Sequence, residues 1–210
     1  MKFHVEILSS AQSKLINQLG RFSSEHGFYL GGGTAIALLL GHRQSDDLDW
    51  FSQNSIGDPA LWTDKLETLG LKPRKVILEK GTFYATINRV RISILEYPYR
   101  MLFLLVPWKS VGCNLASLDD LACMKLSAIA SRGSKKDFVD VYALIKEHKT
   151  LSKMLTLYKK KFPEVDLIPV LRGLSYFDDA DKDPMPRMLW RVKWQDIKQE
   201  ILTELKKSLK

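Results

Sequence analysis

The segment GGGTAIALLLGHRQSDDLDWF, residues 31–51, constrains the fold more than any other part of the chain. Three glycines predict a turn, a short apolar helix follows from Thr34 to Gly41, and a strand then carries Asp47 and Asp49. Thr34 is expected to cap this helix and Gly41 to end it. Because side chains two positions apart on a strand point to the same face, Asp47 and Asp49 are predicted to project together.

Two carboxylates held this close repel each other unless a cation lies between them. Mg²⁺ prefers oxygen ligands and substrate phosphates, and such ions can activate an attacking hydroxyl and neutralise a leaving pyrophosphate. Glycines let the backbone approach a phosphate, and the N-terminus of the following helix attracts anions. The glycine turn and the acidic pair together predict a Mg²⁺-dependent triphosphate site, with Asp47 and Asp49 as metal ligands.

The first half of the chain alternates helix and strand patterns. Apolar residues at helical spacing predict a helix that begins near Ser9 and closes at Gly27. Another helix is expected over 61–70, and β-branched and aromatic residues predict strands over 28–30, 75–79, 82–87 and 90–97. This half is therefore expected to be α+β, with a small mixed or antiparallel sheet.

The second half reads as helix. One helix is predicted over 118–131 with Ser117 as its cap, and another follows Ser134, where Asp137 stands at capping-box spacing. Later helices are expected over 151–160 and 192–208, and the acidic run 178–181 is interpreted as a helix start or a loop. The transition is expected between residues 105 and 116, which divides the chain into a core of 1–106 and a helical domain of 107–210.

Residues 31–51 resemble the Gly-Gly-Thr…Asp-x-Asp signature of DNA polymerase β-like nucleotidyltransferases. They are similar in particular to the AbiEii/AbiGii toxin family, the toxins of abortive-infection toxin–antitoxin systems. The similarity continues in DDLACMKLSAIASRGSKKDFVDVYAL (119–144) and SYFDDADKDPMPRM (175–188), so it spans most of the chain. The resemblance implies a nucleotidyltransferase core with a C-terminal helical domain.

The resemblance also implies a reaction and a set of site residues. A nucleoside monophosphate would pass from an NTP to an acceptor hydroxyl, with RNA or tRNA as the acceptor and a cognate antitoxin as the partner protein. The implied catalytic and Mg²⁺-holding residues are Asp47 and Asp49. The implied substrate-binding residues are Gly32, Gly33 and Thr34 at the triphosphate, Arg43 and Ser45 beside the acidic pair, and Lys125, Arg132, Lys136 and Asp137 in the helical half.

The helical residues can also be read from their spacing. Leu121, Lys125, Ala128 and Arg132 share one stripe of a helix, where a lysine either extends to solvent or meets an anion in a cleft. Asp137 has two readings, a site residue and a helix cap, since it stands three residues after a capping serine.

A third carboxylate commonly completes sites of this kind on a neighbouring strand. The strand over 90–97 carries Ser93 at the expected position, and the nearest acid, Glu96, alternates onto the opposite face. Glu96 could serve only if the strand bulges or ends there. The missing acid leaves open a second hypothesis, a catalytically silent nucleotide- or RNA-binding protein on the same fold.

Charge and composition narrow the remaining alternatives. The formal net charge of +8 favours polyanionic partners such as RNA, DNA or NTPs. Two cysteines exclude a disulfide scaffold and favour a cytoplasmic protein, and neither a signal peptide nor an apolar run of membrane-spanning length is seen. A haloacid dehalogenase-type hydrolase is disfavoured by the glycine-rich lead-in, and a D-x-D glycosyltransferase by the short chain.

Overall fold

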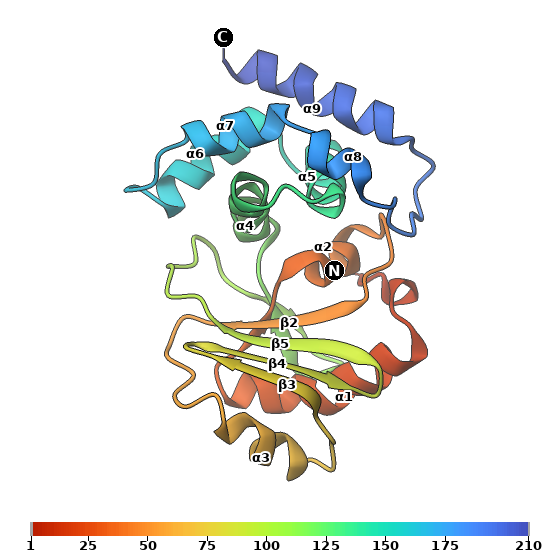
Figure 1. The fold of residues 1–210 in the computed structure, drawn as a ribbon, viewed down its shortest axis with the longest axis vertical. Coiled ribbons are helices and arrows are strands. Elements are labelled where there is room, and N and C mark those ends of the chain that lie inside the picture. The colour runs from red at the N-terminus through yellow and green to blue at the C-terminus, as the bar shows by residue number, and fades with distance from the viewer. Residues whose placement is uncertain (1, 210) are drawn as a thin grey trace.

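One mixed β-sheet forms the lower half of the molecule in Figure 1, and the structure, a computed structural model, describes residues 2–209. Its strands run in the order β3-β4-β5-β2-β1-β7-β6. They are β1 (Tyr29–Leu30), β2 (Asp47–Ser52), β3 (Arg74–Glu79), β4 (Thr82–Ile87), β5 (Val90–Glu96), β6 (Val106–Trp108) and β7 (Cys113–Leu115). Strand β2 is central, parallel to β5 and antiparallel to β1, so the expected α+β class with a mixed sheet is confirmed.

Helices cover the two faces of this sheet unequally. Helices α1 and α3 lie below it, and helices α4 to α9 form a separate layer above it (Figure 1). The helices are η1 (Val5–Ile7), α1 (Ser10–Glu25), α2 (Gly32–Leu40), α3 (Leu61–Glu67), α4 (Leu118–Ser131), α5 (Lys135–Glu147), α6 (Leu151–Lys161), α7 (Ile168–Ser175), α8 (Asp178–Lys182) and α9 (Trp194–Ser208). No helix between residues 2 and 209 is long and apolar enough to cross a bilayer.

Strand β2 positions the acidic pair through its alternating burial. Leu48 and Trp50 are almost fully buried, whereas Asp47 and Asp49 on the other face are only partly buried. Burying side chains of this size contributes about 1.5–3 kcal/mol each. A one-residue slip of β2 would put both apolar side chains on the cleft face, so their burial fixes the direction of the two aspartates.

Helix α2 joins the two layers, because it packs on β2 and also on α4 and α5. Gly41 ends the helix as expected, in the left-handed conformation with φ of 67°. The expected start at Thr34 is wrong: α2 begins at Gly32, with Gly31 at the N-cap position. Thr34 lies inside the first turn, where its hydroxyl donates to the backbone carbonyl of Asp47 and holds α2 to β2.

Strands β6 and β7 are absent from the sequence prediction. Each has three residues, and β6 contains Pro107, so neither shows an alternating pattern long enough to indicate a strand. Strand β7 pairs with β1, so the sheet continues to Leu115, at the far end of the expected transition range of 105–116.

Candidate active site

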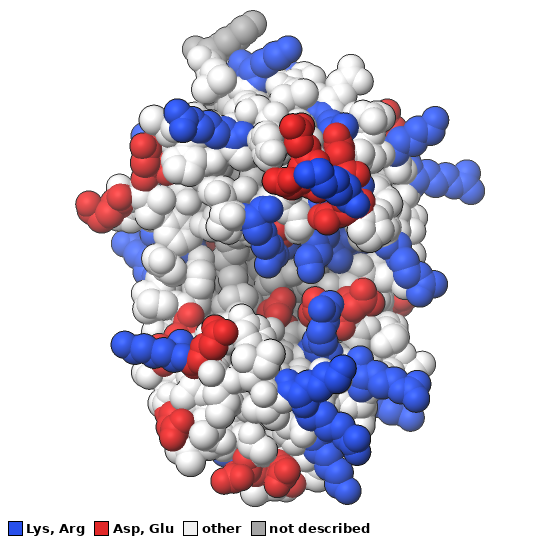
Figure 2. Space-filling view, in the orientation of Figure 1, with Lys and Arg blue, Asp and Glu red and all other residues white. Residues whose placement is uncertain are grey.

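A cleft of about 950 Å³ separates the open face of the sheet from helices α4 and α5. It is the hollow across the middle of Figure 2, with acidic side chains on the sheet side and cationic ones on both sides. Strand, helix and loop residues line it: Gly32, Gly33, Arg43, Gln44, Ser45, Asp46, Asp47, Asp49, Phe51, Tyr84, Arg91, Ser93, Leu95, Tyr97, Met124, Lys125, Ser127, Ala128, Ser131, Arg132, Ser134, Lys136 and residues 183–187. The volume suits a small-molecule ligand.

Asp49 and Ser93 face each other on neighbouring strands. They are register partners of β2 and β5, and the Ser93 hydroxyl donates to Asp49 Oδ1 over 2.7 Å. Burial, together with the charge of Asp47, raises the pKa of Asp49, and the Ser93 hydrogen bond opposes that shift. Ser93 therefore stands where a third carboxylate was expected, and it supports the ionised form of Asp49.

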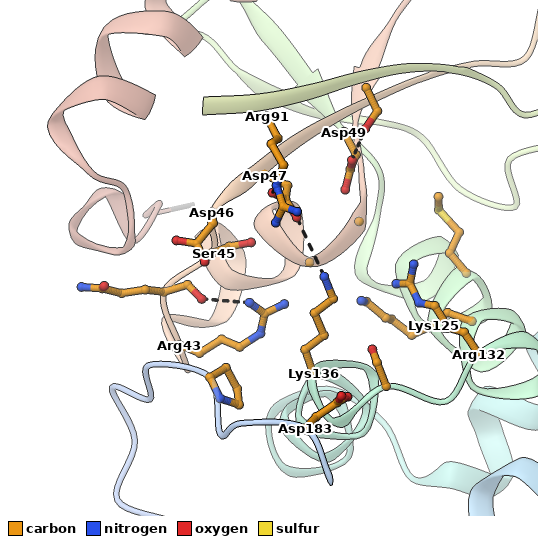
Figure 3. Close-up of a pocket in the computed structure, with 18 of the residues that line it drawn as sticks. Arg43, Ser45, Asp46, Asp47, Asp49, Arg91, Lys125, Arg132, Lys136 and Asp183 are labelled. Carbon is orange, nitrogen blue, oxygen red and sulfur yellow. Dashed lines mark hydrogen bonds and ion pairs between the residues drawn. The ribbon is translucent and has the colours of Figure 1, made fainter. Parts of the chain in front are cut away.

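Cationic side chains from both the sheet and the helical layer approach Asp47. Arg91 of β5 donates through Nε to Asp47 Oδ1 over 2.7 Å, and Lys136 Nζ of α5 lies 3.9 Å from Asp47 Oδ2 (Figure 3). Both cations are substantially exposed, so either one can move to a bound anion without leaving a buried charge unpaired.

The glycine turn is needed because it lies against polar side chains of the site. Gly32 has φ of 62°, and a Cβ there would stand 2.6 Å from Asp49 Oδ2. A Cβ on Gly33 would overlap the guanidinium of Arg43. Both glycines line the cleft, so the chain presents bare backbone beside Asp49.

A buried ion network anchors the helices to the loop between α2 and β2. Asp140 is fully buried and accepts hydrogen bonds from His42 Nε2 (2.7 Å) and Arg43 Nε (2.7 Å), and it pairs with Lys125 Nζ (2.7 Å). Burial alone would raise the pKa of Asp140, but the charges of Arg43 and Lys125 hold it well below its ordinary value. Burial lowers the pKa of His42, so its ring is neutral.

Asp137 belongs to the same network. Its carboxylate is buried and pairs with Lys125 (2.9 Å) and Arg132 (2.9 Å), and it accepts from the Ser134 hydroxyl (2.7 Å). Burial alone would raise its pKa, yet the bonds from Arg132 and Lys125 keep the pKa below its ordinary value. Ser134 stands at the N-cap, but its side chain donates to Asp137 and does not cap the helix, which corrects the expected capping box.

The predicted site residues therefore fall into two groups, those that line the cleft and those that are buried away from it. Nine of them line the cleft: Gly32, Gly33, Arg43, Ser45, Asp47, Asp49, Lys125, Arg132 and Lys136. Thr34 and Asp137 do not line it, because each is buried with its polar atoms bonded within the protein. Lys125 reaches the cleft with only a small exposed fraction, since its Nζ is held by two aspartates.

Glu96 lies away from the cleft. Its carboxylate accepts from the Ser55 hydroxyl (2.6 Å) and the Ile56 amide (2.8 Å), so it holds the loop between β2 and α3. The strand does not bulge to turn it inward, and the possibility that Glu96 replaces the third acid is wrong.

Sequence reasoning missed two groups of cleft residues. Arg91 and Tyr84 follow the same alternation that places Ser93, so strand parity alone could have identified them. Residues 183–187 reach the cleft because the chain that follows them pairs antiparallel with the loop before β2: the Gln44 backbone N–H donates to the Arg187 carbonyl, and Arg43 forms a β-bridge with Met188. No local pattern indicates that contact.

Comparison with known proteins places this geometry in a family. The model of the AbiEii family, described as nucleotidyl transferase AbiEii toxin of type IV toxin–antitoxin systems, matches residues 14–208. An uncharacterized protein of Aquifex aeolicus (strain VF5), aq_aa25, is 32% identical over 184 residues, which are 87% of this chain and 88% of that protein.

Solved structures share the fold at low identity. JHP933 from Helicobacter pylori has a TM-score of 0.61 at 17% identity, over 96% of this chain and 93% of that one. The nucleotidyltransferase toxin MenT4 from Mycobacterium tuberculosis H37Rv has a TM-score of 0.52 at 13% identity, over 93% and 82%. Since the family match covers nearly the whole chain, this chain belongs to the AbiEii family of nucleotidyl transferase toxins.

Proposed function

We propose that the chain transfers a nucleoside monophosphate from an NTP to a hydroxyl of RNA, with tRNA as the first acceptor to test. The observation that carries the proposal is the placement of Asp47 and Asp49 on one face of β2, across the cleft from Lys125, Arg132 and Lys136 (Figure 3). Carboxylates on one wall and cations on the other suit a metal-bound triphosphate.

The acidic pair fits Mg²⁺. Asp49 is partly buried beside another carboxylate and its pKa is raised, which is the condition a divalent cation relieves. Within residues 2–209 no cluster of three or more acidic, histidine or cysteine side chains is formed, so Asp47 and Asp49 would hold the ion together with substrate phosphates and water. Bound there, Mg²⁺ would supply charge neutralisation for the reacting phosphates.

The protein's own groups would orient the reactants. Backbone at Gly32 and Gly33 would lie against the triphosphate, and Lys136 and Arg132 would contact its oxygens from the helical side. The acceptor hydroxyl would lose its proton to water as its oxygen attacks the α-phosphorus, the bond from that phosphorus to the oxygen bridging to the β-phosphorus would break, and pyrophosphate would leave. Ser93 would keep Asp49 ionised and fixed through its hydrogen bond. Arg91 would leave Asp47 and bind a phosphate instead.

We extend the proposal to the biological setting. The chain would act in the cytoplasm as the toxin of an abortive-infection system, held in check by a cognate antitoxin. Both cysteines are buried with free thiols, and burial raises the pKa of each to about 12, so neither is a reactive thiol.

A second candidate is a catalytically silent nucleotide- or RNA-binding protein. The observation that favours it is Ser93, which occupies the position of the third acid and offers no carboxylate for a second ion or a base. This candidate keeps the NTP site and predicts binding without pyrophosphate release.

The deciding experiment incubates the protein with total tRNA, Mg²⁺ and each α-³²P-labelled NTP in turn, followed by a denaturing gel. Label on RNA that is lost in Asp49→Asn and kept in Lys182→Ala, a change in an exposed ion pair of α8, would establish transfer and name the nucleotide. Mg²⁺-dependent NTP binding by calorimetry without labelled RNA would overturn transfer in favour of the silent binder.

A further inference from the structure

The register partners of Asp47 and of Asp49 form two rows of side chains that cross the sheet from β2 to β3. Asp47 pairs with Arg91, Arg91 with Thr86, and Thr86 with Arg74, so this first row crosses β2, β5, β4 and β3. Side chains that are register partners project to the same face. With about 4.8 Å between neighbouring strands, Arg74 stands roughly 14 Å from Asp47 on the cleft face.

The second row has an aromatic and an apolar side chain on β4 and β3, whereas the first row has arginines on β5 and β3. Asp49 pairs with Ser93, Ser93 with Tyr84, and Tyr84 with Ile77. Tyr84 lines the cleft and is 38% exposed. An exposed ring therefore lies immediately beside the line of arginines, and both rows begin at the catalytic carboxylates.

The first row ends in a basic region. Arg74 and Lys75 are exposed at the start of β3, and Arg89 is exposed in the turn between β4 and β5. Figure 2 shows cationic side chains gathered below the cleft, on the right, over this end of the sheet. A β-bulge between Arg74 and Ile77, with φ of 50° at Lys75, keeps Arg74 in line with Thr86 while Ile77 stays opposite Tyr84.

We infer that this surface, the cleft face of β5, β4 and β3 with Arg91, Arg74 and Tyr84, binds the single-stranded end of the acceptor RNA. The inference rests on the proposed function and adds the place where the acceptor lies. A base stacks on the Tyr84 ring, and phosphates follow Arg91 and Arg74, so the terminal hydroxyl is led to Asp47 and Asp49. Cations in a line beside an exposed aromatic ring are the features that hold single strands.

A single strand fits this surface better than a duplex or a protein. A duplex keeps its bases stacked inside and can use only the arginines, so the exposed ring would have no role. A protein strand added to the β3 edge would contact Val76, Ile77 and Leu78 and would leave the cationic row facing solvent. Of these three ligands, only a single-stranded polynucleotide would contact both the arginines of the first row and the Tyr84 ring of the second.

The test measures binding of a labelled single-stranded oligoribonucleotide and of its duplex by fluorescence anisotropy, without NTP. Tyr84→Ala should weaken single-strand binding about tenfold and leave duplex binding unchanged, while Tyr84→Phe keeps the ring and the affinity. Arg74→Ala should lower the slope of log K against log salt by about 0.7. Arg172→Ala, which removes an equal exposed charge on α7 outside the cleft, should leave that slope unchanged.

The outcomes separate this inference from the proposed function. Wild-type affinity in both Tyr84→Ala and Arg74→Ala would overturn the RNA-binding surface while RNA remained the acceptor. Failure of the wild-type protein to bind any RNA would overturn the RNA acceptor itself. Asp49→Asn should bind the oligonucleotide normally while it loses transfer, because Tyr84 and Arg74 lie on strands β4 and β3, away from the two aspartates of β2. If an equal loss appeared for the duplex in Tyr84→Ala, base stacking would be excluded.

Discussion

Two pairs of aspartates, one lining the cleft and one buried within the helical layer, have opposite surroundings. Asp47 and Asp49, on β2, are partly buried, and the pKa of Asp49 is raised by burial and by its neighbour. Asp137 and Asp140, on α5, are fully buried, and cations hold the pKa of each below its ordinary value. Asp49 has no ion-pair partner within residues 2–209, whereas both Asp137 and Asp140 are paired with cations.

The difference shows which carboxylates are available to a ligand. A buried carboxylate that is fully paired stabilises the fold and offers nothing to an incoming cation. A carboxylate such as Asp49, which is crowded by a second carboxylate and has a raised pKa, is costly to the fold unless a cation binds, and such groups concentrate at functional sites. We therefore propose that Asp47 and Asp49 bind the ligand, whereas Asp137 and Asp140 join elements of the fold through their ion pairs.

The sharpest test of the comparison is Asp49→Asn. Removing one ligand of the proposed ion should lower transfer at least about 100-fold, since metal charge stabilisation is worth several kcal/mol. The melting temperature should stay equal or rise, because a carboxyl with a raised pKa opposes folding at neutral pH. Pyrophosphate release and thermal unfolding measure the two effects, and retained activity would remove Asp49 from the site.

The matching change in the buried pair is Asp140→Asn. It leaves Arg43 and Lys125 buried with too little negative charge, so the free energy of unfolding should fall by about 3–5 kcal/mol. Chemical denaturation measures it. Asp179→Asn, in an exposed ion pair with Lys182, is the control and should change stability by less than about 0.5 kcal/mol. Equal stability of the two variants would show that the buried network is not an anchor.

Ser93→Ala keeps both aspartates and tests the hydrogen bond that Asp49 accepts, so its expected effect is smaller. The loss of a hydrogen bond to a carboxylate costs about 1.5–3 kcal/mol, so kcat/KM should fall about 10- to 100-fold. The pKa of Asp49 should rise further, and the acid side of the pH–rate profile should move to higher pH. Ser93→Thr keeps the hydroxyl and should keep the profile. An unshifted profile in Ser93→Ala would mean that Ser93 does not act through Asp49.

The smallest expected effect is a pH dependence of stability from His42. Its pKa is lowered in the fold, so below about pH 6.5 the unfolded chain takes up a proton that the folded protein does not. Stability is therefore full above pH 6.5 and declines as the pH falls, by at most about 1.4 kcal/mol at pH 5.5. Thermal unfolding at pH 7.5 and 5.5 should show this decline, and His42→Gln should reduce it. A decline of the same size in His42→Gln would assign it to other groups.

The sequence predicts those features of the fold and the site that depend only on residues close together in the chain. Alternation along β2 placed Asp47 and Asp49 on one face, and alternation along β5 placed Ser93 inside and Glu96 outside. Such periodicity is local and survives folding because burial of Leu48 and Trp50 enforces it. The family resemblance, carried by the same segment, is confirmed by the match over residues 14–208.

Contacts between distant positions could not be predicted in this way. Asp140 meets Arg43 across 97 positions, and no spacing rule connects a helix residue with a loop residue that far away. For the same reason Asp137 resembled a site residue: its position in the K-D-x-x-D run is visible in the sequence, and its complete enclosure by Lys125 and Arg132 is not. Strands β6 and β7 were missed because three residues are too few to show a period.

The pairing of residues 187 and 188 onto Arg43 and Gln44 has a consequence during synthesis. A ribosome makes the sheet and the acidic pair well before it makes residues 183–188, which complete the cleft wall. Folding that proceeds from the N-terminus can assemble the sheet early but must wait for this segment. A growing chain is therefore without a finished cleft until residues 183–188 have left the ribosome.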